Sequence, residues 1–226
     1  MLMRKPIVLL TGFGPFPGIP DNASSLLVPR LRAAAARAFR SHVFVAEILP
    51  TEWSAGPERM RHLMREIEPD VALHFGVAPR AKGFEIEARG RNLTDGRIDA
   101  AGAKPEARHV VEGGEEYLAS NLPVREIVQR LRGRGLPARI SRSAGRYLCN
   151  CVMYQSLALV NGWSKSVRNG FIHLPATLVD GSDPLRAAPD SPLTQDLAIE
   201  GGLEIIAVCL DRLRGAPVEV ASAVQS

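Results

Sequence analysis

Extended apolar segments alternate along the chain with segments in which apolar residues recur at helical spacing. Continuous apolar, β-branched runs that stop at Gly or Pro predict buried strands. Apolar residues at i, i+3, i+4 and i+7 predict helices with one buried face. The predicted strands are residues 6–11, 43–50, 71–76, 84–88, 138–143 and 171–174. The predicted helices are residues 24–39, a segment from the N-cap Ser54 to Ile67, and residues 124–133, 149–161 and 192–213. This alternation indicates an α/β fold.

No internal repeat, low-complexity tract or Pro/Gly-rich linker divides the chain. A length of 226 residues suits one sizeable domain, so we expect a single domain over residues 1–226. Two stretches carry no periodicity, residues 89–123 and the Asp/Pro-rich residues 180–192. We expect long loops there, and loops of that length often border binding sites.

The composition excludes a disordered or membrane-spanning chain. It is 46% hydrophobic and 23% charged, and its apolar runs are far shorter than the roughly 18 residues that cross a bilayer. Arg4 and Lys5 do precede the apolar residues 7–10, but Thr11 and Gly12 end this run short of a secretory core. We therefore expect a cytoplasmic protein with no membrane contact.

Cysteine and arginine usage narrows the classes further. The three cysteines are an odd number, and Cys149-x-Cys151 lacks zinc-site spacing, so we expect neither a disulfide framework nor a bound metal. Six of the 24 arginines crowd residues 130–146, yet no aromatic residue among the 12 interleaves with them to stack bases. We expect solvated helix ends and loops there and no nucleic-acid partner.

Three residues carry possible chemistry. Cys149 stands at the start of a predicted helix, where the helix dipole favours a thiolate and the free N–H groups can hold an oxyanion. His173 and Glu87 each stand near the end of a predicted strand. Together they form a nucleophile, a base and an orienting carboxylate. The spacing alone leaves the alternative open that they are a buried structural cysteine, a strand-end histidine and a solvated carboxylate.

Four motifs in order resemble those of the pyroglutamyl peptidases, also called pyrrolidone-carboxylate peptidases, a family of cysteine peptidases. Thr-Gly-Phe-Gly-Pro-Phe (residues 11–16) with Asn-Ala-Ser (22–24) is similar to the family's amino-terminal motif. Gly-Val-Ala (76–78), Ile-Glu (86–87) and Asp-Gly-Arg-Ile (95–98) are similar to its central motif. Ser-Ala-Gly-Arg-Tyr-Leu-Cys-Asn (143–150) resembles its nucleophile motif, and Gly-Phe-Ile-His-Leu-Pro (170–175) its histidine motif.

The resemblance implies removal of an N-terminal pyroglutamyl residue from peptides by a hydrolase that needs no cofactor or metal. It implies a phosphorylase/hydrolase-like three-layer α/β/α sandwich with a mostly parallel sheet, assembled as a homotetramer. It also implies residue roles, which are a triad of Cys149, His173 and Glu87, oxyanion support from Arg97 beside the Cys149 amide, and a substrate pocket formed by Phe13, Phe16, Asn22 and Val77. A small apolar pocket suits an uncharged lactam and gives an ammonium no partner.

The chain departs from the family at Ala23, Val77, Ala88 and Cys151, where the family commonly has Pro, Gln, Arg and His. Cys151 points to another helix face than Cys149, and we give it no catalytic role. Val77 keeps open a related hydrolase of another small cyclic or N-acyl amide. A binding protein for an anionic or nucleic-acid partner through residues 130–146 is a further alternative.

Overall fold

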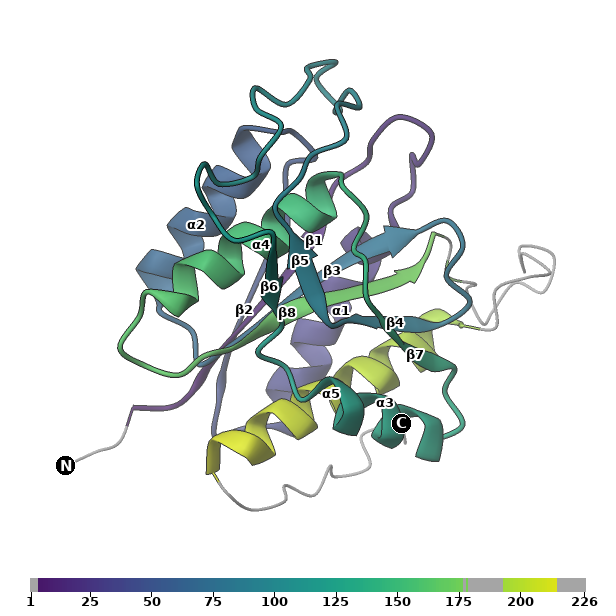
Figure 1. Cartoon of the computed structure of the whole chain (residues 1–226). Coiled ribbons are helices and arrows are strands. Elements are labelled where there is room, and N and C mark those ends of the chain that lie inside the picture. Colours follow the sequence, from purple (N-terminus) through teal and green to yellow (C-terminus); the bar gives the residue numbers. More distant parts are fainter. Residues whose placement is uncertain (1–3, 177, 179–192, 215–226) are drawn as a thin grey trace, which may run out of the picture.

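A six-stranded sheet forms the centre of the fold, in the order β2-β1-β3-β8-β4-β7 (Figure 1). The computed structural model describes residues 4–176, 178 and 193–214. The strands of the sheet are β1 (Ile7–Phe13), β2 (Val43–Leu49), β3 (Val71–Ala78), β4 (Phe84–Glu87), β7 (Ala138–Ser141) and β8 (Arg168–Pro175). Five of the six predicted strands match these bounds within two residues, so the apolar runs did predict the strands, although β7 is mostly exposed.

Helices cover both faces of the sheet. On one face lie α1 (Ala23–Ala38), α3 (Val124–Gly133) and α5 (Gln195–Arg214), and on the other lie α2 (Ala55–Ile67) and α4 (Leu148–Asn161) (Figure 1). Each face has its own cluster of buried apolar side chains, because successive residues of a strand point to opposite faces. The expected α/β/α sandwich is confirmed. None of the helices within the described residues is long and apolar enough to span a membrane.

The strand directions bring several chain segments to one edge of the sheet. Strands β2, β1, β3 and β8 run parallel, whereas β4 is antiparallel to β8 and parallel to β7. The sheet is therefore mostly parallel, as expected. The carboxyl ends of β1, β3 and β8 meet the beginning of β4 at one edge, and this is the kind of edge where open α/β sheets bind ligands.

Three predictions of local structure need correction. Strand β8 is longer than the predicted residues 171–174, because it pairs with β3 along all of Arg168–Pro175. The predicted loop 89–123 contains a second sheet of β5 (Arg89–Arg91) and β6 (Tyr117–Ala119), whose three-residue strands are too short to show a period. Ser54 precedes α2 but makes no side-chain capping bond, because its backbone is already helical instead of extended. The predicted loop 180–192 lies outside the described residues.

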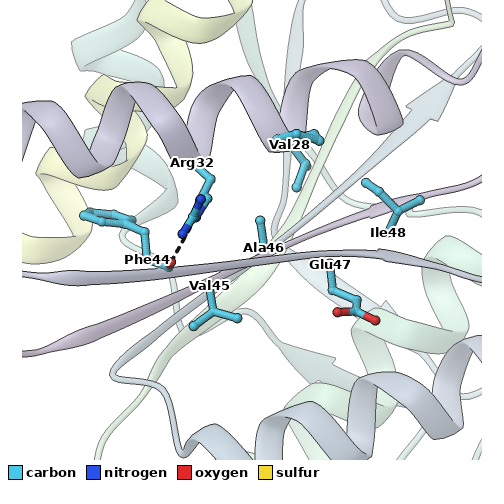
Figure 2. A pocket seen from close by; sticks show the side chains of 8 residues that line it. Val28, Arg32, Phe44, Val45, Ala46, Glu47 and Ile48 are labelled. Carbon is cyan, nitrogen blue, oxygen red and sulfur yellow. Dashed lines mark hydrogen bonds between the residues drawn. The ribbon is translucent and has the colours of Figure 1, made fainter.

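Strand β2 is one edge of the large sheet. Figure 2 shows Arg32 of α1 reaching over this edge, where its Nε donates to the carbonyl of Phe44 at 3.3 Å. A hollow of about 390 Å3 lies between α1 and β2 there, lined by Val28 and residues 44–48 among others (Figure 2). The cation partly covers a row of backbone groups that another strand would otherwise pair with.

Some arginines of residues 130–146 hold elements together, although we expected only solvated ends. Arg130 of α3 and Arg134, directly after this helix, reach the carboxylate of Glu204, which is 3% exposed on α5, at 3.2 and 2.9 Å. These ion pairs neutralise a buried charge and join α3 to α5.

Candidate active site

Cys149, His173 and Glu87 come together on the face of the sheet that α4 covers. Nδ1 of His173 lies 2.8 Å from Oε1 of Glu87, and the thiol of Cys149 is close enough to the imidazole to raise its pKa. Because Nδ1 is engaged by the carboxylate, Nε2 is the ring nitrogen left for the thiol. Three residues that span 86 positions of the chain thus bring a thiol, an imidazole and a carboxylate together.

The surroundings of His173 favour its charged form. Burial of the ring lowers its pKa, but hydrogen bonds with Cys149 and Glu87 and the charges of both groups outweigh burial and raise the pKa of His173 to about 10. Glu87 is completely buried, and its carboxylate balances the imidazolium. At neutral pH the site therefore keeps a proton on the imidazole.

Cys149 is the second residue of α4. The first N–H groups of a helix have no intrahelical partner, and the helix dipole adds positive potential there, so the amide of Cys149 is a donor for an anion beside its own sulfur. Gly76, in β3, leaves room for that sulfur: a Cβ at this position would lie 2.9 Å from Sγ of Cys149. Only glycine at position 76 lets β3 pass this close to the sulfur of Cys149.

A cavity of about 510 Å3 opens above the thiol. It is lined by Cys149 and His173 and by all the residues predicted to support or bind substrate, which are Phe13, Phe16, Asn22, Val77 and Arg97. Its volume lies within the range of small-ligand pockets. The structure therefore brings every sequence-predicted site residue to one cavity, except Glu87, which lies behind His173.

The loop that carries Phe16 is fastened to the start of α1. Asn22 caps this helix, since its Oδ1 accepts from the N–H of Ser24 at 3.1 Å, and its Nδ2 donates to the carbonyl of Gly14 at 3.0 Å. The hydroxyl of Thr51 donates to the same carbonyl at 2.9 Å. Asn22 thus supports the wall of the cavity, and Thr51, which also lines it, is a residue that the sequence analysis missed.

Arg97 stands at the mouth of the cavity with its side chain 62% exposed. Its Nε donates to Oδ2 of Asp95 at 2.7 Å, and its guanidinium lies 4.6 Å from the centre of the Tyr147 ring. Tyr147 also contacts Phe16, with ring centres 5.9 Å apart, and donates its hydroxyl to the carbonyl of Ile98 at 3.0 Å. Tyr147, another missed residue, thus joins the Arg97 segment to the aromatic wall.

Asn150 is the most consequential residue that the sequence analysis passed over. Its Nδ2 donates to the carbonyls of Arg91 and Leu93 at 2.8 and 3.0 Å, and its Oδ1 accepts from the N–H of Arg91 at 2.8 Å. These bonds fasten the segment after β5, which leads to Arg97, to the first turn of α4. The signal was present, because Asn150 is the last residue of the nucleophile motif.

Two further groups lie near Cys149 and His173, the acid Glu85 and the thiol Cys151. Glu85 also lines the cavity, and its carboxylate is paired with Arg139 at 2.6 Å. Cys151 points away, as expected, and accepts from Nε2 of Gln155 at 3.6 Å. Burial raises the pKa of Cys151 to about 12, so its thiol stays protonated.

Among the described residues, no three His, Cys, Asp or Glu side chains are grouped so that they could hold a metal ion.

A thiol at a helix start, in line with a buried imidazole and carboxylate at the edge of an α/β sheet, is the arrangement of cysteine-type hydrolases. The family model for pyroglutamyl peptidase matches residues 6–201. The chain belongs to this family, and it is a cysteine-type peptidase.

Individual relatives agree with this family assignment. The chain is 31% identical to the pyrrolidone-carboxylate peptidase of Oceanobacillus iheyensis over 209 residues, which are 92% of this chain and 100% of that protein. It is 39% identical to the pyrrolidone-carboxylate peptidase of Pyrococcus furiosus over 171 residues, 74% of this chain and 80% of that one. Among solved structures, pyroglutamyl peptidase I of Bacillus amyloliquefaciens superposes with a TM-score of 0.78 at 28% identity, covering 91% of this chain and 97% of that chain. Pyrrolidone carboxyl peptidase of P. furiosus does so with a TM-score of 0.81 at 31% identity, covering 92% and 99%.

Proposed function

We propose that this protein hydrolyses the amide bond that follows an N-terminal pyroglutamyl residue, with Cys149 as nucleophile, His173 as base and acid, and Glu87 as the group that orients His173. The observation that carries the proposal is that Cys149 and His173 line one cavity of about 510 Å3, with Nδ1 of His173 bonded to Oε1 of Glu87 behind it. The names of the relatives support the substrate class.

The reaction follows from this geometry. Nε2 of His173 holds the proton that the thiol gives up, and the sulfur of Cys149 attacks the carbonyl that links the lactam to the next residue. The tetrahedral oxyanion accepts from the Cys149 amide, with Arg97 as a second donor. His173 then protonates the departing amine, and water, deprotonated by the same imidazole, hydrolyses the thioester to release pyroglutamate.

The cavity suits a small uncharged ring. Phe13, Phe16 and Val77 give it an apolar wall, and Val77 offers only its backbone to the lactam where the family commonly has glutamine. The acid Glu85 is paired with Arg139, so an ammonium would lose its water without gaining a free carboxylate. These features disfavour peptides with an ordinary amino terminus.

The experiment that tests the function is hydrolysis of a neutral chromogenic pyroglutamyl amide at neutral pH, with and without iodoacetamide. Peptide mapping then identifies the alkylated cysteine. Burial raises the pKa of both Cys151 and Cys209 to about 12, so we expect alkylation at Cys149 alone and loss of turnover in step with it. Cys149→Ala provides the inactive control.

Two other outcomes would contradict parts of the proposal. If the amide is not hydrolysed but Cys149 is still alkylated selectively, the proposed catalytic residues stand and the proposed substrate is wrong. The substrate would then be another small cyclic or N-acyl amide. Prolyl and acetyl chromogenic amides identify that case. Turnover that persists in Cys149→Ala would reject the nucleophile.

We also propose that residues 1–226 form a single peptidase domain that acts in the cytoplasm as a homo-oligomer, a tetramer by resemblance to the family. Three free cysteines, one of them the nucleophile, suit a reducing compartment. Size-exclusion chromatography with light scattering measures the assembly.

A further inference from the structure

A second hollow adjoins the catalytic cavity. It has a volume of about 320 Å3 and lies where β4 and β7 begin, around Phe84 and Pro137. It shares two residues, Arg80 and Glu85, with the catalytic cavity. The two spaces are therefore neighbours along the same edge of the sheet, and a ligand in the cavity can continue into this hollow, which we call the β4–β7 groove.

The β4–β7 groove is positively charged. Arg80, Lys82 and Arg139 line it together with one acid, Glu85. Arg139 is committed to Glu85, because its Nε and Nη2 lie 3.0 and 2.6 Å from the same carboxylate oxygen. Arg80 and Lys82 are exposed, and neither forms an ion pair with any residue that the structure describes. Two cations therefore remain available to a ligand.

The position of the groove relative to His173 determines which part of a substrate it meets. His173 protonates the departing amine, so the chain beyond the scissile bond leaves from the side of the imidazole. Glu85 is the direct partner of His173 in the antiparallel pairing of β4 with β8. The groove begins at Glu85, whereas the apolar wall of Phe13 and Phe16 belongs to the other part of the cavity. The groove thus faces the leaving peptide.

We propose that the β4–β7 groove is a subsite for the leaving peptide, and that Arg80, with Lys82, selects a carboxylate there. This inference rests on the proposed function and names the substrates it favours, which are pyroglutamyl peptides with a negative charge close after the scissile bond. The carboxylate comes from one of two sources, the free carboxyl terminus of a dipeptide or an acidic side chain.

The test compares two pairs of substrates that differ only in charge. Pyroglutamyl-alanine against its carboxyl-terminal amide measures the terminal carboxylate, and pyroglutamyl-glutamate amide against pyroglutamyl-glutamine amide measures the side chain. An exposed ion pair contributes little binding free energy. We therefore expect kcat/KM to favour the charged substrate in at least one of the two comparisons by about two- to fivefold at low salt. The preference shrinks at about 1 M salt, where the screening length falls to about 3 Å.

Substitutions of Arg80 test whether this residue causes the preference for charged substrates. We expect Arg80→Lys to keep the ratio between charged and neutral substrates and Arg80→Glu to invert it. The matched control is Arg37→Ala, an exposed arginine in the last turn of α1, which keeps the ratio because it lies about 20 Å along the helix from the Asn22 end that lines the cavity. Arg80 is exposed, so its replacement leaves the fold intact.

Each result separates this inference from the proposed function. Equal turnover of charged and neutral partners in both pairs, or an unchanged ratio in Arg80→Glu, overturns the subsite and leaves the peptidase proposal standing. Absence of hydrolysis of every pyroglutamyl substrate, the neutral chromogenic amide included, overturns both.

Discussion

His173 hydrogen-bonds to Glu87, which lies diagonally from it across the β4–β8 pair, although Glu85 is its direct partner in that pair. The two carboxylates lie on the same face of β4 and have different partners. Glu85 is held by Arg139, whose side chain is 62% exposed, whereas Glu87 is completely buried and meets the imidazole at 2.8 Å. One carboxylate thus borders the groove, and the other pairs with the imidazole.

Glu87→Gln is expected to lower the pKa of His173. The hydrogen bond and the charge of Glu87 both raise this pKa, so their loss lets burial, which lowers it, weigh more. Titration of the imidazole by NMR in the Cys149→Ala background measures the effect. Cys149→Ala removes the effect of the thiol from both proteins, so the lower pKa of the Cys149→Ala/Glu87→Gln double variant, compared with Cys149→Ala alone, reports the effect of Glu87.

Glu85→Gln in the same background is the matched control. Glu85 is not among the groups that shift the pKa of His173, so its replacement leaves the titration of the imidazole in place. Equal displacement by both glutamine variants would show that the imidazole responds to the summed charge of β4 and not to the hydrogen bond with Glu87.

Gly76→Ala is expected to reduce kcat/KM by about a hundredfold, because a displacement of about 1 Å at the reacting atom costs that much. The added Cβ would lie 2.9 Å from Sγ of Cys149 and 2.8 Å from Cζ of Phe171, so the thiol or the ring must move. Overpacking also lowers the free energy of unfolding by about 1–3 kcal/mol. Chromogenic amide kinetics and urea unfolding measure the two effects.

Gly133→Ala controls for the loss of a glycine. No atom lies within 4 Å of a Cβ at that position, near the end of α3, so activity stays at the level of the unchanged protein. Full activity in Gly76→Ala would mean that the strand relaxes away from the sulfur and that glycine is not needed there.

Periodicity and motifs predicted most of this molecule. The apolar runs predicted buried strands such as β3 directly. Motifs that include the neighbouring residues identified Cys149 and His173 as candidate site residues. The sequence could not show that Glu85 faces the same cavity as Val77, because the reversal of β4 against β8 is a property of the sheet. It also missed β5 and β6, which bury a single apolar side chain, that of Leu118, and are held mainly by backbone pairing and by Asn150.

Asn150→Ala is expected to lower the free energy of unfolding by about 2–4 kcal/mol. The change leaves the N–H of Arg91 and the carbonyls of Arg91 and Leu93 without their partner, and Asn150 is 1% exposed. Urea unfolding measures the loss. Asn161→Ala, an exposed position at the end of the same helix, is the control with the same atoms removed. Equal urea midpoints of unfolding for the two variants would show that Asn150 does not fasten the β5 segment.

Arg97→Ala separates a role in the reaction from a role in binding. If the guanidinium stabilises the oxyanion, it acts in the transition state, so kcat falls by about a hundredfold while KM changes little. Arg97→Lys keeps the charge but loses the planar contact with Tyr147 and the Nε bond to Asp95, so we expect partial recovery of kcat. The measurement is steady-state hydrolysis of the neutral chromogenic amide. A rise in KM with unchanged kcat would instead make Arg97 a residue of the cavity mouth, and the Cys149 amide would then hold the oxyanion without it.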